Sequence, residues 1–323
     1  MMSEVMQLLL ASLVFPGGLF VALFGLYLKG VDRKLIARLQ ARVGPPLTQS
    51  FFDTLKLMNK ETLIPRQANV PVFLGAPLFG FAAMAFAPVL IPVPGFYQPP
   101  VVTGDVLVLL YLLAVPGIVI MLSGSSSGSL YGAIGFSREM SLILAYEGPL
   151  LFALVAVAVY VGQMQGGTVA LSLNEILAYQ EMHGANLLQP VLWPALLAYL
   201  ACLPATLGVP PFDIAEAETE ILEGPLIEYS GPALGLLQLM QAMQRVVALA
   251  LGVVLFFPTA PEGIWGLIVF VLKILVMAML AITLLRASIG RMRIDQAIIF
   301  FFTWPEAAGL LSLILIVFFC VKG

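Results

Sequence analysis

The chain carries little charge and few of the side chains that usually build catalytic or metal sites. Of its 323 residues, 10% are charged and 61% are hydrophobic, with one histidine and two cysteines. A soluble globular domain carries about 25% charged residues, so this composition indicates an integral membrane protein. The single histidine, His183, does not support a Ser/His/Asp triad or a metal site. A net charge of −3 without a basic patch excludes nucleic acid as an expected partner.

The two cysteines, Cys202 and Cys320, lie in separate apolar runs without disulfide or metal-site spacing. We expect both to be small buried hydrophobes. No cysteine cluster is present to hold an iron–sulfur centre. The Gly/Ser stretch Ser123–Ser129 has neither the lysine nor the spacing of a phosphate-binding loop. Redox chemistry is therefore not expected to reside in this chain alone.

Continuous apolar runs of about 20 residues predict membrane-spanning helices, since the strands of a barrel would alternate apolar and polar residues. The predicted fold is an all-α integral membrane protein, a bundle of about eight transmembrane helices with amphipathic cytoplasmic helices. We expect one membrane domain over residues 1–323. The apolar N-terminus lacks a basic start and a cleavage site, so we expect a retained helix. The predicted spans are 5–28, 70–93, 105–123, 139–161, 189–208, 233–256, 263–286 and 297–320.

Lysines and arginines gather in loops that fall on one side of this predicted bundle. Twelve of the fifteen lie between spans one and two, just before span four, or between spans seven and eight. By the positive-inside rule that side is cytoplasmic, which predicts a multi-pass protein of the cell membrane with both termini outside. The segments expected to face a cytoplasmic partner are 29–69, 124–138, 208–232 and 287–296.

The first of these segments predicts two amphipathic helices. One has apolar residues at helical spacing from Leu35 to Val43, and a second covers about 48–60, with Gly44-Pro45-Pro46 between them. Lipid anchoring alone would explain such helices. The arrangement of two such helices separated by a Gly-Pro-Pro break also favours a docking platform for a cytoplasmic partner. The candidate docking residues here are Arg33, Lys34, Arg38, Arg42, Lys60 and Glu61.

The most unusual feature is an acidic segment, Gly208–Gly231, with six carboxylates and no lysine or arginine. Pro210-Pro211 predict the end of span five, and Asp213 then resembles a helix N-cap. Spacings of three, four and three from Asp213 to Glu223 predict one face of a helix. Coupled carboxylates of this kind share protons and titrate as a group, although a solvated acidic loop is the alternative. The six carboxylates are Asp213, Glu216, Glu218, Glu220, Glu223 and Glu228.

Ionisable residues also occur inside predicted spans, where a central charge costs at least about 2.5–3.5 kcal/mol. Glu139 and Glu147 lie in span four, Arg245 in span six and Lys273 in span seven, while Glu306 in span eight is a weaker candidate. If they face one another, they form a polar axis from the acidic segment into the bundle. A static ion pair that orients the helices is the alternative.

Five motifs then occur in a characteristic order: DRKLIARLQARVGPP, DTLKLMNKE, GFSREMSLILAYE, PPFDIAEAETEILEGPLIEYSG and RASIGRMRIDQ. The set resembles the H subunit of complex I, which adjoins the quinone cavity, and its counterpart in group 4 membrane-bound nickel–iron hydrogenases. The resemblance covers nearly the whole chain. The forms EGPLIEYSG and AYEGPL look closer to the hydrogenase branch.

The resemblance implies a subunit that anchors a peripheral redox arm and begins an ion path toward antiporter-like membrane subunits. Peripheral hydrogenase-like large and small subunits are the implied partners, and they would carry the nickel–iron centre and iron–sulfur clusters. It implies ion-coupling roles for Glu139, Glu147, Lys273 and the six carboxylates. It implies docking roles for Arg286, Arg291, Arg293 and Asp295. The roles of Arg245 and Glu306 rest on expected burial alone.

The function expected from this resemblance is to link ferredoxin-dependent H2 evolution in a partner to H+ or Na+ translocation. The alternatives are the quinone-tunnel subunit of an NADH or ferredoxin:quinone oxidoreductase, and the equivalent subunit of a sulfur-reducing complex. A purely structural anchor with no part in ion movement is a further alternative.

Overall fold

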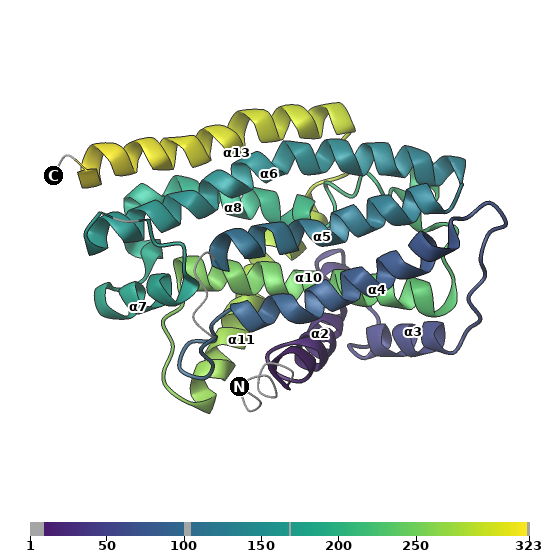
Figure 1. Ribbon diagram of the computed structural model, residues 1–323, viewed down its shortest axis with the longest axis horizontal. Coiled ribbons are helices and arrows are strands. Elements are labelled where there is room, and N and C mark those ends of the chain that lie inside the picture. Colours follow the sequence, from purple (N-terminus) through teal and green to yellow (C-terminus); the bar gives the residue numbers. More distant parts are fainter. Residues whose placement is uncertain (1–9, 100–104, 168, 322–323) are drawn as a thin grey trace.

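The structure, a computed structural model, describes residues 10–99, 105–167 and 169–321 and is dominated by helices (Figure 1). Seven of the eight predicted spans correspond to helices long and apolar enough to cross a membrane, and the eighth corresponds to a shorter apolar helix, Pro190–Thr206. The predicted all-α membrane bundle is therefore confirmed, although one of its helices is short. The seven helices of the described part that are long and apolar enough to cross a membrane are Leu10–Leu39, Val70–Leu90, Asp105–Ser126, Leu130–Gln165, Gly231–Phe256, Ile264–Ser288 and Ile294–Phe319.

The α-helices form two groups around the central helix α10 (Figure 1). Helices α2, α3, α4 and α11 pack against α10, while α6 lies among α5, α8 and α13. A five-residue π-helix, Met279–Thr283, joins α11 to α12. The bounds are α2 Gly18–Leu39, α3 Gln49–Met58, α4 Val70–Phe86, α5 Asp105–Ser126, α6 Leu130–Gln165, α7 Leu173–His183, α8 Trp193–Thr206, α9 Glu218–Ile221, α10 Gly231–Phe256, α11 Ile264–Ala278, α12 Leu284–Ser288 and α13 Ile294–Ile316.

One part of the predicted organisation is wrong. The first amphipathic helix is not a separate element, because α2 continues without a break from the apolar span through to Leu39. Between residues 28 and 39 no proline interrupts the helix, and the first strong breakers are Gly44-Pro45-Pro46. The second amphipathic helix is present as α3. As a consequence, Lys29 and Asp32 are carried inward on a spanning helix instead of lying in an interfacial loop.

The four predicted docking segments meet at one end of the bundle, at the right in Figure 1. The N–H of Leu63 donates to Ser230 Oγ at 2.9 Å. The N–H of Asn69 donates to the carbonyl of Ser126 at 2.9 Å, and that of Met292 donates to the carbonyl of Pro211 at 3.0 Å. These bonds join residues from all four segments. Helix α7 and the C-terminal ends of α6 and α13 lie at the opposite end.

Candidate functional site

The acidic segment does not form the predicted helical stripe. Only Glu218–Ile221 is α-helical, followed by the 3-10 turn Gly224–Leu226, and the N-cap of the α-helix is Ala217, so the expectation that Asp213 caps a helix is wrong. Leu222 and Glu223 have φ of 53° and 66°, in the left-handed region that ends a helix. Asp213 and Glu216 precede the helix, Asp213 in irregular backbone and Glu216 in a turn. Helical spacing predicted a shared face, but tertiary docking determines this segment.

That docking is made by the turn Gly224–Leu226, which packs against α5 and α6. A methyl group at Gly135 of α6 would overlap the Pro225 ring, and one at Gly124 of α5 would also crowd Pro225. Gly224 has φ of 47° and lies against the carbonyl of Ala215. Small residues on two spanning helices therefore let the segment lie directly against the bundle.

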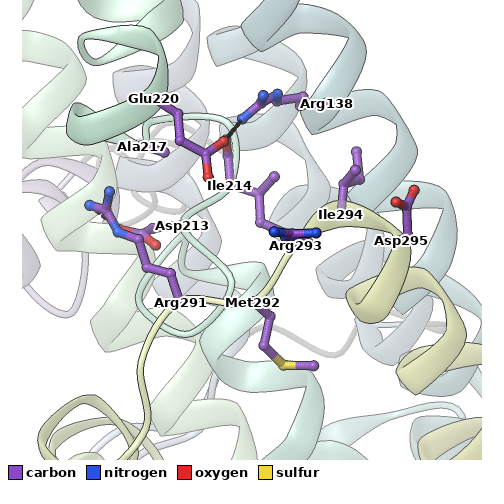
Figure 2. Close-up of a pocket in the computed structure, with 10 residues that line it drawn as sticks. All are labelled: Arg138, Asp213, Ile214, Ala217, Glu220, Arg291, Met292, Arg293, Ile294 and Asp295. Atoms are coloured by element: carbon purple, nitrogen blue, oxygen red, sulfur yellow. Dashed lines mark hydrogen bonds and ion pairs between the residues drawn. The ribbon is translucent and has the colours of Figure 1, made fainter.

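A surface pocket of about 220 Å³ opens where the acidic segment meets the loop before α13 (Figure 2). Two arginines hold the segment: Arg291 Nη2 lies 2.8 Å from Asp213 Oδ2, and Arg138 Nη1 of α6 lies 2.5 Å from Glu220 Oε2. Arg293 and Asp295 also line this pocket. Residues predicted separately as ion-coupling and as docking are therefore neighbours.

Asp213 also lines a second cavity, the inner pocket, together with Glu139, Glu216, Gln241 and Gln244. Its volume of about 10 Å³ is close to the minimum that a single water molecule needs. Gln241 Nε2 donates to Glu216 Oε1 at 2.7 Å, while Gln244 Nε2 donates to the carbonyls of Leu113 and Thr206. Asp213 is thus the one residue common to the two linings, which makes it the link between the surface pocket and the inner pocket.

Burial raises the pKa of two carboxyl groups that lie outside the membrane-spanning helices, those of Glu216 and Asp213. Desolvation raises the pKa of Glu216 to about 7, partly offset by the hydrogen bond from Gln241 and the charge of Lys29. Desolvation also raises the pKa of Asp213 from its usual value, opposed by the charge and hydrogen bond of Arg291. Glu216 therefore gains or loses its proton close to neutral pH, where a small change in nearby charge alters its ionisation.

A second group of charged residues is centred on Asp32 of α2, which is joined to the span Ile264–Ser288. It accepts a hydrogen bond from Thr283 Oγ1 at 2.9 Å and pairs with Arg286 Nη1. Arg245 of α10 interacts electrostatically with Asp32, Arg286 and Glu216. Its Nε atom is buried without a hydrogen-bond partner among the described residues. This Asp32 cluster therefore adds charged groups of α2 and α12 to the electrostatic surroundings of Arg245 and Glu216.

The predicted polar axis through Lys273 is not formed. Lys273 Nζ donates to the carbonyl of Phe257 at 2.7 Å and also to that of Thr259, so it binds carbonyl groups beyond the end of α10. Position in a span could not show that α10 ends beside this lysine. Glu147 and Glu306 are half-buried on α6 and α13, and no hydrogen bond or ion pair among the described residues joins them to the acidic segment.

The other predicted residues lie as follows. Glu139 is buried on α6, Glu220 and Glu223 are exposed, and Glu228 is half-buried. The side chain of Glu218 lies outside the described residues. Arg33 pairs with Asp53 at 3.3 Å. The remaining docking candidates, Lys34, Arg38, Arg42, Lys60 and Glu61, lie at or near the surface around α2 and α3.

Sequence reasoning did not find Asp32, Lys29, Gln241, Gln244 and Thr283. A signal for Asp32 and Lys29 was available, because an unbroken helix would carry them inward from the interface. On α10, Gln241 lies three residues after Gln238 and four before Arg245, and Gln244 lies three residues after Gln241. A helical projection would have shown these polar residues close together on the helix. Within the described part of the chain, no group of three or more metal-ligating side chains is present.

Comparisons with known proteins place these features in context. The sequence profile of a family described as NADH dehydrogenase matches residues 12–317. The H subunit of NADH-quinone oxidoreductase from Dehalococcoides mccartyi (strain ATCC BAA-2266 / KCTC 15142 / 195) is 33% identical over 336 residues, covering 98% of this chain and 88% of the relative. Formate hydrogenlyase subunit 4 of Escherichia coli K12 is 33% identical over 278 residues, covering 83% and 86%.

A solved structure is also similar over nearly the whole chain. It is that of the membrane-bound sulfane sulfur reductase, an archaeal respiratory membrane complex. One of its chains matches with a TM-score of 0.84 and 29% identity, covering 95% of this chain and 99% of that one. Sequence and fold similarity therefore extend across the spans as well as the acidic segment.

Proposed function

The chain belongs to the NADH dehydrogenase family, that of the complex I H subunit, and on that premise we propose that it couples a redox reaction in a partner to ion movement. It is a multi-pass membrane subunit of an energy-converting complex. No complete redox centre is evident in its sequence, which has two cysteines and one histidine. We therefore propose that this chain transmits changes of charge, while its partners carry out the electron transfer.

One observation carries this proposal: Asp213 lines both the surface pocket and the inner pocket that holds Glu216. A partner docked over the surface pocket would contact Arg291, Arg293 and Asp295. A change of charge there would alter the pairing of Asp213 with Arg291. Because Glu216 titrates near pH 7, this alteration would change its proton occupancy, and the Asp32 cluster would respond through Arg245.

For the reaction in the partner, we favour ferredoxin-dependent H2 evolution at a peripheral nickel–iron site. The forms EGPLIEYSG and AYEGPL support this branch, as does the similarity to formate hydrogenlyase subunit 4. The partners are then hydrogenase-like large and small subunits carrying the nickel–iron and iron–sulfur groups, with antiporter-like membrane subunits beside the bundle. The distribution of basic residues favours the cell membrane with both termini outside.

Quinone reduction is the second candidate, because the relative from NADH-quinone oxidoreductase is equally similar at 33% identity. A purified complex distinguishes the two. H2 evolution from reduced ferredoxin, with a copurified large subunit that holds the four cysteines of a nickel–iron site, supports the hydrogenase proposal. Electron transfer to added quinone that quinone-site inhibitors block would overturn it.

Ion coupling is tested with the intact complex in proteoliposomes, by measuring electron transfer and ion uptake together. In Glu216→Gln we expect electron transfer to continue while ion uptake per electron falls about tenfold or more, since a relay group has lost its titration. Glu262→Gln, an exposed carboxylate before α11, is the matched control and should leave the ratio unchanged. Full ion uptake in Glu216→Gln would instead support a purely structural anchor.

A further inference from the structure

A basic pocket of about 290 Å³ lies between α2, α3 and the first turns of α10, apart from the acidic segment. We call it the lysine pocket. Each of the three helices contributes to its lining, so it is fixed by the packing of the bundle instead of by a loop. Its polar lining residues are Lys29, Arg33, Ser50, Asp53, Lys56 and Lys60, together with Gln238.

The charge of the lysine pocket is strongly unbalanced. Four cationic side chains face one carboxylate, and that carboxylate is already engaged. Asp53 Oδ2 lies 3.3 Å from Arg33, and Asp53 Oδ1 accepts a hydrogen bond from Gln49 at 2.7 Å. Within residues 10–99, 105–167 and 169–321, no hydrogen bond or ion pair holds the ammonium group of Lys56 or of Lys60. Such a site attracts an anion.

A buried hydroxyl group gives an independent indication of a ligand. Ser50 is 3% exposed, and its Oγ atom is buried without a hydrogen-bond partner in the described part of the chain. Buried polar groups are nearly always hydrogen-bonded, and an unmade bond costs about 1–3 kcal/mol. Because Ser50 lines the lysine pocket, an oxygen atom of a bound anion would complete its hydrogen bonding.

We propose that the lysine pocket binds the phosphate group of an anionic phospholipid. Phosphate offers several acceptor oxygens for the lysines, Arg33 and the Ser50 hydroxyl together. A lipid is favoured as the source because an exposed apolar side chain adjoins the pocket on α3: Phe52, one turn before Lys56, is 56% exposed. It would contact an acyl chain while the pocket holds the headgroup, as basic pockets beside membrane helices do.

The lipid would tie α3 to α2 and α10 at the end of the bundle where the docking segments meet. This role does not depend on the identity of the electron acceptor or on ion coupling. The proposal can therefore fail while the proposed function holds, and the reverse is equally possible.

The test measures lipids retained by the intact complex after detergent washing, by native mass spectrometry. The complex is first exchanged into vesicles of phosphatidylcholine with or without phosphatidylglycerol. We expect retention of phosphatidylglycerol and a loss of roughly fivefold for each lysine removed in Lys56→Gln/Lys60→Gln. Ser50→Ala, which keeps the charge, should also weaken retention. Lys34→Gln/Arg66→Gln removes the same charge outside the pocket and should retain the lipid.

Four results would overturn the proposal. The first is equal retention in the pocket variant and the charge-matched control. The second is no preference for phosphatidylglycerol over phosphatidylcholine. The third is full displacement of the lipid by inorganic phosphate, which would make a free anion the ligand. The fourth is loss of a peripheral subunit from Lys56→Gln/Lys60→Gln with lipid retention unchanged, which would make the pocket a protein contact.

Discussion

The two halves of α10 differ sharply in chemistry. Its first half, residues 231–245, carries four polar side chains that line or adjoin the inner pocket, the lysine pocket and the Asp32 cluster. They are Gln238, Gln241, Gln244 and Arg245. Every residue of its second half, Val246–Phe256, is apolar or glycine and buried. Residues 231–245 alternate between buried and half-buried positions, whereas every residue from Val246 to Phe256 is buried. The polar part of the helix therefore lies beside the pockets, and the apolar part is enclosed by other helices.

Polar groups near the second half serve a different purpose. Gln180 and Asn186 donate to the carbonyls of Val254 and Leu255 at 2.9 and 2.8 Å, and Lys273 donates to that of Phe257. The last carbonyls of a helix have no partner within it, so these side chains complete its C-terminus. Two of the three cannot titrate. The apolar half of α10 itself therefore offers no titratable side chain that could take up an ion.

The largest effect that would separate the two halves is expected from Asp32→Asn. This change leaves Arg286 without its carboxylate partner and removes a negative charge that stabilises Arg245. Breaking a fully buried ion pair costs about 3–5 kcal/mol, and this largely buried pair should approach that cost. We expect a marked fall in the thermal stability of the purified complex. Asp53→Asn breaks a half-exposed pair and should cost about 0–1 kcal/mol. Equal effects of the two changes would show that the Asp32 cluster is not structurally important.

A smaller effect is expected from Gly135→Ala, which places a methyl group against the Pro225 ring. Overpacking of this kind costs about 1–3 kcal/mol, and the acidic segment should give way because it is not part of a spanning helix. Limited proteolysis within residues 208–231 should become faster. Gly148→Ala, on the same helix with no atom near the added methyl, is the control. Unchanged proteolysis would mean that the segment is held elsewhere.

Beside the end of the apolar half, on α11, Lys273→Met should cost about 1 kcal/mol, because it removes hydrogen bonds to carbonyls beyond α10. The ratio of ions moved to electrons transferred should not change, because Lys273 makes no described contact with the acidic segment. The measurement combines thermal denaturation with ion uptake in proteoliposomes. A large loss of ion uptake at unchanged stability would return Lys273 to the ion path.

The smallest effect is expected from Glu220→Gln, since its pair with Arg138 is largely exposed on the carboxylate side. Exposed pairs contribute about 0–1 kcal/mol and are screened by salt. The variant should unfold close to the temperature of the unmodified complex, with any difference disappearing at high salt. A difference that persists in high salt would show a buried role for this carboxylate.

The spans could be predicted from the sequence because apolar runs of membrane length have few alternative structures. The conformation of the acidic segment could not, because Pro225 meets Gly135 across 90 residues and this contact overrides local helical spacing. Asp32 escaped detection because its partner Arg286 lies 254 residues away. Lys273 was assigned to the ion path from its depth in a span and from the family resemblance, and neither reveals the end of a neighbouring helix. Local patterns thus predicted elements, while the site depends on which distant segments touch.

The most direct test of this account is the protonation of Glu216 in the intact complex, followed by infrared spectroscopy of its carboxyl group. The difference between unmodified complex and Glu216→Gln identifies the signal. We predict a midpoint near pH 7, with the protonated form below it, and a change in that signal when the electron donor is added at neutral pH. A midpoint near the usual 4.5, with no response to the donor, would contradict a coupling role for the acidic segment.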